Sequence, residues 1–503
     1  MKDGMMNRCE SANRSWRHLA PKVLVCLGIS LLSGYTAASA TGDSRMVESQ
    51  KIAPADLPER WSYLPEYQIE APSADDCWWT TFGQAPLDSL IKAGMANNYN
   101  VSAAWHRSMA AKAAVGQARS NWYPSVGLSA GWNKARTSGL TMSRSGAPVT
   151  TSYFDAGLSA SWEVDIFGKV ASEVKGRDAA FKATRAQWAG TMVSMSAQIA
   201  ATYMQLRMYQ CLLEVAHAHL ASQQKIVAIA KARYEATISS KLDVAQAEET
   251  YYSTAATLPP IENSIYRSIN ALALLTALPR DSVSRLVAAD SVAMPQPLRI
   301  MQWGIPADIL RRRPDIAEAE MQVAEYAAQL GMARKDFLPA LAINGSIGTQ
   351  AHDISDMFKT DSFTWSVAPT LSWTLFEGFN RKYAVASARE SMRAAVDNYN
   401  LVVSTAIEET DNAMCSYTQS IRHMKALEKE IEANAEAYRL AVDRYKSSLS
   451  PMSDVVNAQI NAYECQSQYI QAQGSALAAL VSLYEALGGG FDANSLEVKH
   501  PCD

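Results

Sequence analysis

Residues 154–164 read Phe-Asp-Ala-Gly-Leu-Ser-Ala-Ser-Trp-Glu-Val, and their alternation is the strongest indication of fold in the chain. Every second residue from Phe154 to Val164 is apolar, and the residues between them are small or polar. Strict period-two alternation predicts a β-strand with one apolar and one polar face. A tilted strand of about ten residues is long enough to cross a bilayer. The segment is therefore predicted to be a membrane strand.

A second segment with the same alternation covers residues 363–375. Pro369 interrupts its apolar face and indicates a bend or an edge. Each alternating segment has a partner before it, so the predicted strands cover about 124–133, 153–165, 339–348 and 363–375. The loops that close the two predicted hairpins are polar, as exposed loop tips usually are.

Tryptophans lie near the ends of these strands, where membrane barrels carry girdles of aromatic residues. The predicted membrane-interface aromatics are Trp132, Trp162, Trp365 and Trp373. The opposite faces carry small, uncharged polar residues, which suit a wet lumen. The alternative is a half-buried sheet in a soluble protein, and both observations weigh against it.

The chain repeats itself in order. Gly-Gln-Ala-Arg-Ser-Asn-Trp-Tyr-Pro at 116–124 recurs as Gly-Met-Ala-Arg-Lys-Asp-Phe-Leu-Pro at 331–339, and residues 158–162 resemble 369–373. The pair Arg233-Tyr234, followed by Asp243, matches Arg444-Tyr445, followed by Asp454. The sequence therefore predicts two copies of one unit, over 86–280 and 306–488, joined by a proline-containing linker at 281–305.

Two stretches are too long for ordinary helices. Residues 168–235 contain no proline and residues 380–446 contain neither proline nor glycine, so each predicts a helix of roughly 100 Å at 1.5 Å per residue. Apolar residues in the second stretch recur about every 3.5 positions, which indicates side-by-side coiled packing. A second long helix is expected in each copy, over 240–277 and 452–487, and shorter helices near 86–121 and 306–336 precede the hairpins.

Four strands cannot close a barrel, because about eight is the practical minimum. After Ala40 the sequence contains no run of about 18 apolar residues, so any membrane span must be made of strands. The barrel must then be shared between several chains, and the sequence predicts an oligomer.

Residues 1–40 are predicted to be a signal peptide, with basic residues, the apolar run 23–32 and the cleavage site Ala38-Ser39-Ala40. Met5 or Met6 could be the true start. The net charge of −4 gives no basic footprint for nucleic acid. Seven cysteines show no C-x-x-C spacing, so we expect buried or incidental thiols rather than a disulfide framework or a zinc site.

The run Ile-Pro-Ala-Asp-Ile-Leu-Arg-Arg-Arg-Pro-Asp-Ile at 305–316 resembles the hallmark of outer-membrane factors of tripartite efflux pumps, the TolC superfamily in its OprM/NodT-like branch. Residues 162–169 and 373–378 resemble the strand-to-helix junctions of that family. For Arg313, Pro314 and Asp315 we expect a structural role at a domain junction rather than ligand binding. Pro314 suits a first helical turn, and Asp315 complements the helix dipole.

The resemblance implies an α+β membrane protein that forms a homotrimer. Each chain would give four strands to one shared outer-membrane β-barrel and long helices to a periplasmic α-helical barrel. Segments 41–85, 281–305 and 489–503 would form an equatorial region. The implied location is the outer membrane of a Gram-negative bacterium, in contact with lipid and extending into the periplasm. The implied partners are a periplasmic adaptor (membrane fusion) protein and an inner-membrane pump of the resistance-nodulation-division (RND) type, which open the channel.

Three positions depart from the family pattern. Tyr35 stands where a lipid-bearing cysteine is common, so we expect cleavage after Ala40 without acylation. Thr237 and Ser448 stand where the helix tips, the expected adaptor contacts, commonly have glycine. Asp454 and Asn457 match two aperture aspartates of TolC, so one carboxylate is retained. Asp454 is weighed equally as a pore residue and as a helix cap, and Asp243 is expected to be only a cap.

No motif for catalysis, nucleotide binding or a cofactor is present, and the group Glu214, His217 and His219 is interpreted as a solvated helix face rather than a metal site. The predicted function is a passive exit duct for drugs or other small molecules. Two alternatives stay open: the outer-membrane channel of a type I protein secretion system, and a structural coiled-coil protein of the envelope.

Overall fold

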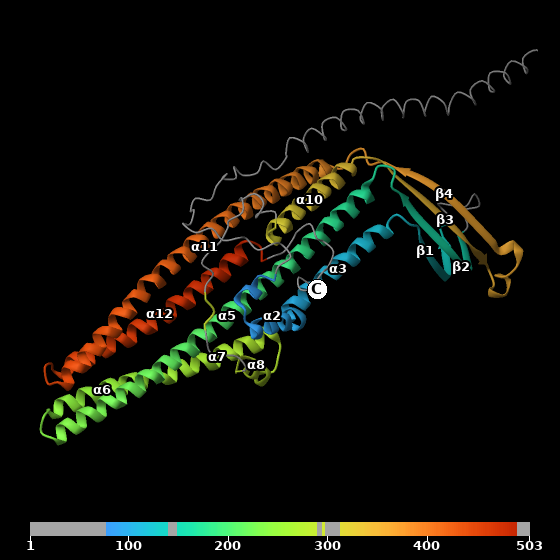
Figure 1. Cartoon of the computed structure of the whole chain (residues 1–503). Coiled ribbons are helices and arrows are strands. Elements are labelled where there is room, and N and C mark those ends of the chain that lie inside the picture. The colour runs from blue at the N-terminus through green and yellow to red at the C-terminus, as the bar shows by residue number, and fades with distance from the viewer. Residues whose placement is uncertain (1–76, 139–147, 289–293, 297–311, 490–503) are drawn as a thin grey trace, which may run out of the picture. The chain divides into compact units, whose positions relative to one another are not determined.

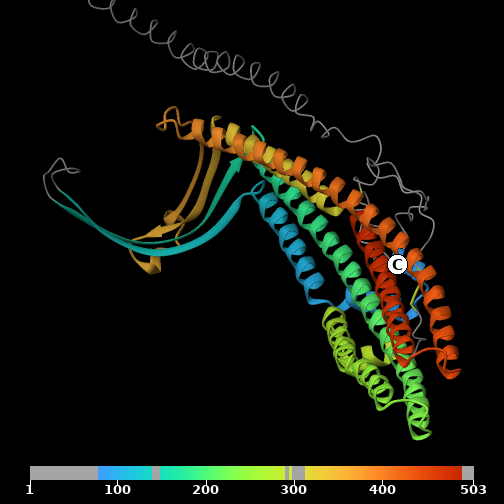
Figure 2. The same cartoon turned by 90° about the vertical axis from the view of Figure 1, so that its left-hand side faces the viewer.

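A computed structural model describes residues 77–138, 148–288, 294–296 and 312–489 of the chain (Figure 1). The predicted signal peptide, with Tyr35 and Ala38-Ser39-Ala40, lies outside these residues, as do most of the predicted equatorial segments. The described part is mostly helical and contains one small antiparallel sheet. Both views show the sheet beyond the beginnings of helices α5 and α11, and the turns that follow these helices at the opposite end (Figure 1, Figure 2).

The sheet has four strands in the order β1-β2-β3-β4, and each neighbouring pair is antiparallel. The strands cover Ser125–Thr137, Val149–Val164, Ala340–Ala351 and Phe363–Ser372. Strand β4 ends at Ser372 rather than near 375, and Pro369 lies on it opposite Ile343. Among the described residues β1 and β4 each have one neighbouring strand, so both are edges. An edge strand tolerates a proline because its outer side needs no amide hydrogen for the ladder.

The register gives the sheet two different faces. Leu128, Leu158, Ile347 and Trp365 lie in one row across the four strands, and all four are exposed. The adjacent row on the opposite face is Gly127, Ser159, Ser346 and Ser366. The alternation seen in the sequence is therefore a continuous apolar surface on one side of the sheet and a small, polar surface on the other.

Strands β2 and β3 join the two copies of the repeat, and two glycines lie opposite each other at this seam. A Cβ at Gly348 would stand 2.5 Å from the Ala156 carbonyl oxygen, and a Cβ at Gly157 would stand 2.8 Å from the Ile347 carbonyl oxygen. Glycine is needed at both positions because the backbones of the two strands approach so closely there.

Helices α5 (Lys169–Glu235) and α11 (Asn380–Lys446) each contain 67 residues. Helix α12 (Met452–Ala486) is continuous. The single helix expected over 240–277 is instead two helices, α6 (Lys241–Ala256) and α7 (Leu258–Thr276). Pro259 and Pro260 explain the difference, because proline lacks the amide hydrogen and its ring clashes with the preceding helical turn.

A similar division occurs before the first hairpin. The helix expected near 86–121 is two helices, α2 (Ala85–Asn97) and α3 (Tyr99–Ser120), with Asn98 in an extended conformation between them. The corresponding helix of the second copy, α10, covers Pro314–Lys335, and the short helices η1 (Trp78–Phe82) and α8 (Arg280–Ala288) complete the main elements. In the part of the chain that the structure describes, no helix is both long and apolar enough to cross a bilayer.

The main core lies where α2, α5 and α12 meet η1. Trp78 stacks on Tyr484 with ring centroids 4.9 Å apart, and Leu87, Ile199 and Leu480 are fully buried beside them. Cys211, Cys415 and Cys465 form no disulfide bond. Cys77 is disulfide-bonded, so the expectation of an incidental thiol is wrong for Cys77.

Candidate functional site

The two helical turns farthest from the sheet share one backbone conformation. We call residues 233–243, from the last turn of α5 to the first turn of α6, the first tip. Residues 444–454, from the last turn of α11 to the first turn of α12, are the second tip. The Ile238 amide donates to the Arg233 carbonyl at 2.9 Å, and the Leu449 amide donates to the Arg444 carbonyl at 2.9 Å. This bond closes a Schellman motif, in which the penultimate residue adopts a left-handed conformation.

The residues in that left-handed conformation are Thr237, with φ of 61°, and Ser448, with φ of 57°. Both were singled out in the sequence because glycine is common there in the family. The turn keeps its left-handed geometry without glycine, although a side chain at positive φ costs about 1 kcal/mol. The Thr237 hydroxyl donates to the Ala236 carbonyl at 2.7 Å.

The helices that leave the two tips begin differently. The Ser240 hydroxyl accepts a hydrogen bond from the Asp243 amide at 3.3 Å and donates to Oδ1 of Asp243 at 3.0 Å. Pro451 takes the place of Ser240 in the second tip, and no side chain caps α12. Asp243 therefore supports the cap that Ser240 makes, whereas the capping role weighed for Asp454 is wrong. The spacing Ser-x-x-Asp against Pro-x-x-Asp was a readable signal of this difference.

Asp454 and Asn457 lie on the exposed side of the first turns of α12. Their positions differ by three, so their side chains are neighbours on one face of the helix. The structure shows no hydrogen bond or ion pair for the Asp454 carboxylate within the described ranges. A carboxylate in that state keeps its charge available to ions or to another chain.

Arg233 joins the first tip to the second. Its Nη2 donates to Oγ of Ser448 at 2.9 Å, and its Nη1 donates to the Lys446 carbonyl at 3.3 Å. Its guanidinium carbon lies 4.8 Å from the centroid of the Tyr445 ring, a cation–π distance. We call this group of contacts the tip joint. Sequence reasoning used the Arg-Tyr pair only as a marker of the repeat and missed the role of Arg233.

The tip joint is backed by a small apolar cluster. Tyr445 is 3% exposed and lies in a cluster formed by α5, α6, α11 and α12. The buried members of this cluster are Ile226, Ala230, Ala247, Tyr445, Met452 and Val455. Burial raises the pKa of the Tyr445 hydroxyl, and the negative charge of Asp243 raises it further. Tyr445 therefore remains neutral and serves as a flat surface for the arginine.

Each copy of the repeat is also closed on itself by one residue. Asn98, the N-cap of α3, donates from Nδ2 to the Leu275 carbonyl near the end of α7 at 2.7 Å. Arg313, the N-cap of α10, donates from Nη1 to the Ala486 carbonyl at the end of α12 at 2.9 Å. We call these two contacts the first clasp and the second clasp. They satisfy carbonyls that the end of a helix leaves without intrahelical partners.

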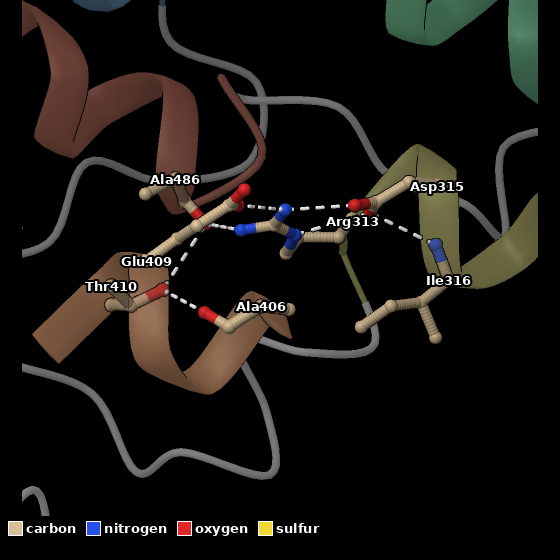
Figure 3. A network of polar contacts seen from close by, with 7 residues as sticks. All are labelled: Arg313, Asp315, Ile316, Ala406, Glu409, Thr410 and Ala486. Atoms are coloured by element: carbon tan, nitrogen blue, oxygen red, sulfur yellow. Dashed lines mark hydrogen bonds and ion pairs between the residues drawn. The ribbon is translucent and has the colours of Figure 1, made fainter. Parts of the chain in front are cut away.

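The second clasp contains ion pairs as well (Figure 3). Nη2 of Arg313 lies 2.7 Å from Asp315 and 2.6 Å from Glu409, and Asp315 accepts the Ile316 amide at 2.9 Å. Burial of Arg313 acts to lower its pKa, but the hydrogen bonds and charges of Asp315 and Glu409 outweigh burial and raise the pKa. Pro314 is the first residue of α10. The predicted hallmark residues are thus brought together where α10 meets α11 and α12.

The predicted membrane-interface aromatics lie at two levels of the sheet. Trp162 and Trp373 are at its helical end, and their indole nitrogens donate to the carbonyls of Trp122 at 3.0 Å and Phe337 at 2.9 Å. Trp132 pairs with Phe154, and Trp365 pairs with Ile347, closer to the hairpin loops. Trp132, Trp365 and Trp373 are exposed and Trp162 is half-buried.

Metal-binding geometry was not found in the described ranges, where no group of three His, Cys, Asp or Glu side chains converges. His219 instead lies 2.7 Å from Oε1 of Gln466 and stacks edge-on against Tyr463. These contacts join α5 to α12 and give His219 a packing role.

A sheet with one apolar face, joined to paired long helices in a duplicated chain, defines a class of envelope channel proteins. Residues 90–278 and 305–489 match the family model described as Outer membrane efflux protein. The match covers more than half of the chain, and the chain therefore belongs to this family. Membership places the protein in the outer membrane of Gram-negative bacteria as an efflux channel.

Curated relatives agree with this placement, and a solved structure agrees with the fold. The chain is 29% identical over 498 residues to the pyoverdine export outer membrane protein OpmQ of Pseudomonas putida, covering 95% of this chain and 98% of the relative. It is 28% identical over 416 residues to nodulation protein T of Rhizobium leguminosarum bv. trifolii, covering 82% and 88%. The outer-membrane channel OprN superposes with a TM-score of 0.78 at 24% identity, covering 87% of this chain and 99% of that chain.

Proposed function

We propose that the chain forms, as a homotrimer, the outer-membrane duct of a tripartite efflux system that exports small molecules. The register of the sheet carries this proposal. The row Leu128, Leu158, Ile347 and Trp365 gives a lipid-facing surface, and the serines of the opposite face give a wet lumen. Three such sheets, joined β4 to β1, would close a barrel of twelve strands, which four strands alone cannot do.

The partners follow from the same proposal. A passive duct needs a partner that supplies the energy for transport. An RND-type pump in the inner membrane would supply this energy, and a periplasmic adaptor would connect the pump to the duct. Family members act in such systems, and the relatives matched here include the probable efflux pump outer membrane protein TtgC of Pseudomonas putida, 25% identical over 470 residues. The adaptor would contact the tips, where Thr237 and Ser448 are exposed.

The assembly is tested by isolating the protein from outer membranes. We expect a trimer that survives unheated detergent electrophoresis, dissociates on boiling and conducts ions in planar bilayers. Deleting the gene should increase cellular accumulation of pump substrates. A monomeric, non-conducting protein would rule out the duct.

Asp454 supplies the first prediction about the pore. In the proposed trimer three exposed Asp454 carboxylates would form a ring that attracts cations at the periplasmic mouth. Asp454→Ala should therefore weaken block of the channel current by multivalent cations. Asp243→Ala is the matched control, because Asp243 is engaged with Ser240 and should leave the block unchanged. Equal block in the wild type and in Asp454→Ala would exclude Asp454 from the pore.

A further inference from the structure

The side chain of Arg444, the counterpart of Arg233, has no hydrogen bond or ion pair within the described ranges. It is exposed at the end of α11, while Arg233 is half-buried against the second tip. The tyrosines differ in the same way: Tyr445 is 3% exposed, and its counterpart Tyr234 is 46% exposed. One copy of the Arg-Tyr pair thus supplies the arginine of the tip joint, and the other supplies the tyrosine.

The tip joint uses neither Tyr234 nor Arg444, and these two residues are of the same types as the tyrosine and the arginine that it does use. Arg233 contacts Tyr445, the Lys446 carbonyl and the Ser448 hydroxyl. The residues at the same positions of the first tip are Tyr234, Glu235 and Thr237, and all three are exposed. The first and second tips share their backbone conformation, so the acceptor groups of the first tip are arranged like those that Arg233 already binds. The Thr237 oxygen donates its hydrogen to Ala236 and can still accept a hydrogen bond.

We infer that Arg444 binds the first tip of a neighbouring copy of this chain, with its guanidinium over Tyr234 and its hydrogen bonds to the Glu235 carbonyl and the Thr237 hydroxyl. The inference rests on the proposed trimer. Three chains in a closed ring present first and second tips alternately. The tip joint links first to second tip within each chain, and Arg444 would repeat that link from each chain to the next. The six contacts then have one geometry, three within chains and three between them.

Charge distinguishes the two kinds of contact. Arg233 meets the tip that carries Lys446, a side chain of like charge, and uses only the backbone carbonyl of that residue. Arg444 would meet the tip that carries Glu235, whose exposed carboxylate shows no partner in the described part of the chain. The contact between chains therefore gains an ion pair that the tip joint lacks. Opposite charges favour this pairing, and it should weaken as ionic strength rises.

A simpler account is that Arg444 only complements the negative end of the α11 dipole. That account explains the exposed arginine, but it gives no role to the exposed Tyr234 on the other tip. It also predicts that Arg444 is close to no particular residue of a second chain. Crosslinking between chains separates the two accounts.

The experiment uses the full chain in outer membranes, treated with a short bismaleimide and then boiled in detergent. The variant that carries Thr237→Cys and Arg444→Cys should give covalent dimers and trimers. The variant that carries Arg233→Cys and Ser448→Cys is the matched control, since the tip joint places that pair within one chain. It should remain at monomer mass while losing two maleimide-reactive thiols. The background is set by each single variant and by the wild type, in which Cys211, Cys415 and Cys465 form no disulfide bond.

The outcomes separate the inference from the proposed function. A ladder for the Thr237/Arg444 pair above that of the single variants supports the inference. A trimer intact in the unheated sample, with no ladder for this pair while the control pair reacts, overturns the inference and leaves the duct in place. A protein that is monomeric without heating overturns both.

Charge reversal gives a second measurement that does not depend on cysteine chemistry. Arg444→Glu should lower the temperature at which the trimer dissociates in detergent, and adding Glu235→Arg should restore it. High salt should reduce the difference between wild type and Arg444→Glu. An unchanged dissociation temperature in Arg444→Glu would overturn the inference.

Discussion

The first tip and the second tip have the same backbone, but different side chains hold them in place. Both close through a Schellman motif, with Thr237 or Ser448 in the left-handed position. The first tip continues into a helix capped by Ser240, and the second continues into a helix that begins with Pro451 and has no side-chain cap. The duplicated sequence has thus kept the hydrogen bonds that define the turn and has changed the groups that a partner or an ion would meet.

The two clasps repeat this relation at the other end of the helices. Asn98 and Arg313 both bind the last turn of their own copy, but only Arg313 also forms ion pairs, with Asp315 and Glu409. The two copies thus place a residue with the same role at the same point of the fold, but the residue is neutral in the first copy and charged in the second. Each of the following predictions tests one of these differences.

The largest effect is expected at the clasps. Arg313→Ala removes several charge-assisted hydrogen bonds and leaves the Ala486 carbonyl with only the long hydrogen bond from the Thr410 hydroxyl at 3.4 Å. The free energy of unfolding should therefore fall by about 3 kcal/mol. Asp315 and Glu409 are about half exposed and can be rehydrated, which keeps the loss below that of a fully buried pair. Asn98→Ala removes a neutral cap and should cost about 1 kcal/mol. Denaturant unfolding followed by circular dichroism measures both, and equal losses would contradict the comparison.

The next effect concerns the caps. Pro451→Ser recreates in the second tip the Ser-x-x-Asp pattern of the first, and we expect α12 to be stabilised by about 1 kcal/mol. The new serine should also bind the Asp454 carboxylate, as Ser240 binds Asp243. Cation block of the channel should then weaken in Pro451→Ser, but less than in Asp454→Ala, because the hydrogen-bonded carboxylate keeps its negative charge. Ser240→Ala is the matched control, with a loss of about 1 kcal/mol and unchanged block.

A smaller effect is expected from the left-handed residues. Thr237→Gly removes a side chain at positive φ and should stabilise the fold by about 0.5–1 kcal/mol. Ser448→Gly relieves the same strain but also removes the hydroxyl that accepts a hydrogen bond from Arg233, so we expect little net change in stability. Gly488 is a useful contrast, because it has φ of 91° and a Cβ there would stand 3.0 Å from the Arg312 carbonyl oxygen. Gly488→Ala should therefore destabilise the protein. A loss of stability in both tip variants would show that the side chains of Thr237 and Ser448 are needed at the tips.

The smallest effect depends on pH. Burial raises the pKa of Glu485, next to the second clasp, and the charge of Glu409 adds to it, while Ser194 and Arg313 act in the opposite direction. A carboxyl with a raised folded pKa binds its proton more tightly in the folded state, so stability falls as pH rises from its unfolded pKa through its folded pKa. Glu485→Gln should remove this loss, leaving stability similar at acidic pH and slightly higher at neutral pH.

Leu274 occupies the corresponding position in the first copy and is 77% exposed. Leu274→Gln is therefore the control for Glu485→Gln, and its effect on stability should not depend on pH. Thermal unfolding of the two variants at pH 4 and pH 7 would make the comparison. A gain in stability that is the same at both pH values in Glu485→Gln would contradict a raised pKa of the Glu485 carboxyl in the folded protein.

Much of the backbone followed from local patterns. Alternation indicated the strands, and the lack of proline between 168 and 235 and between 380 and 446 indicated helices that the structure has as Lys169–Glu235 and Asn380–Lys446. The prediction of one helix over 240–277 is wrong because it does not take Pro259-Pro260 into account, and these prolines separate α6 from α7. Asn98 was likewise passed over, although asparagine before a helix is a common cap.

The contacts of the candidate site were harder to predict from the sequence. Arg233 and Arg444 are each followed by a tyrosine, and only the fold shows that the side chain of Arg233 is bound within the chain while that of Arg444 has no partner in the described ranges. Arg313 was expected to pair with carboxylates, but its bond to the Ala486 carbonyl joins residues far apart in the chain. Such contacts depend on which helices become neighbours, and a pattern read along one strand or helix does not contain that information.

The clasps also bear on how the duplicated chain can be divided. Each one joins the beginning of a copy to the end of the same copy, Asn98 to Leu275 and Arg313 to Ala486. A break in the chain between the copies would leave both closures in place, and the pairing of β2 with β3 would still hold the halves side by side. The clasps thus close each copy on itself, and the core that α2 and α5 share with α12 gives two separately expressed halves the contacts to reassemble.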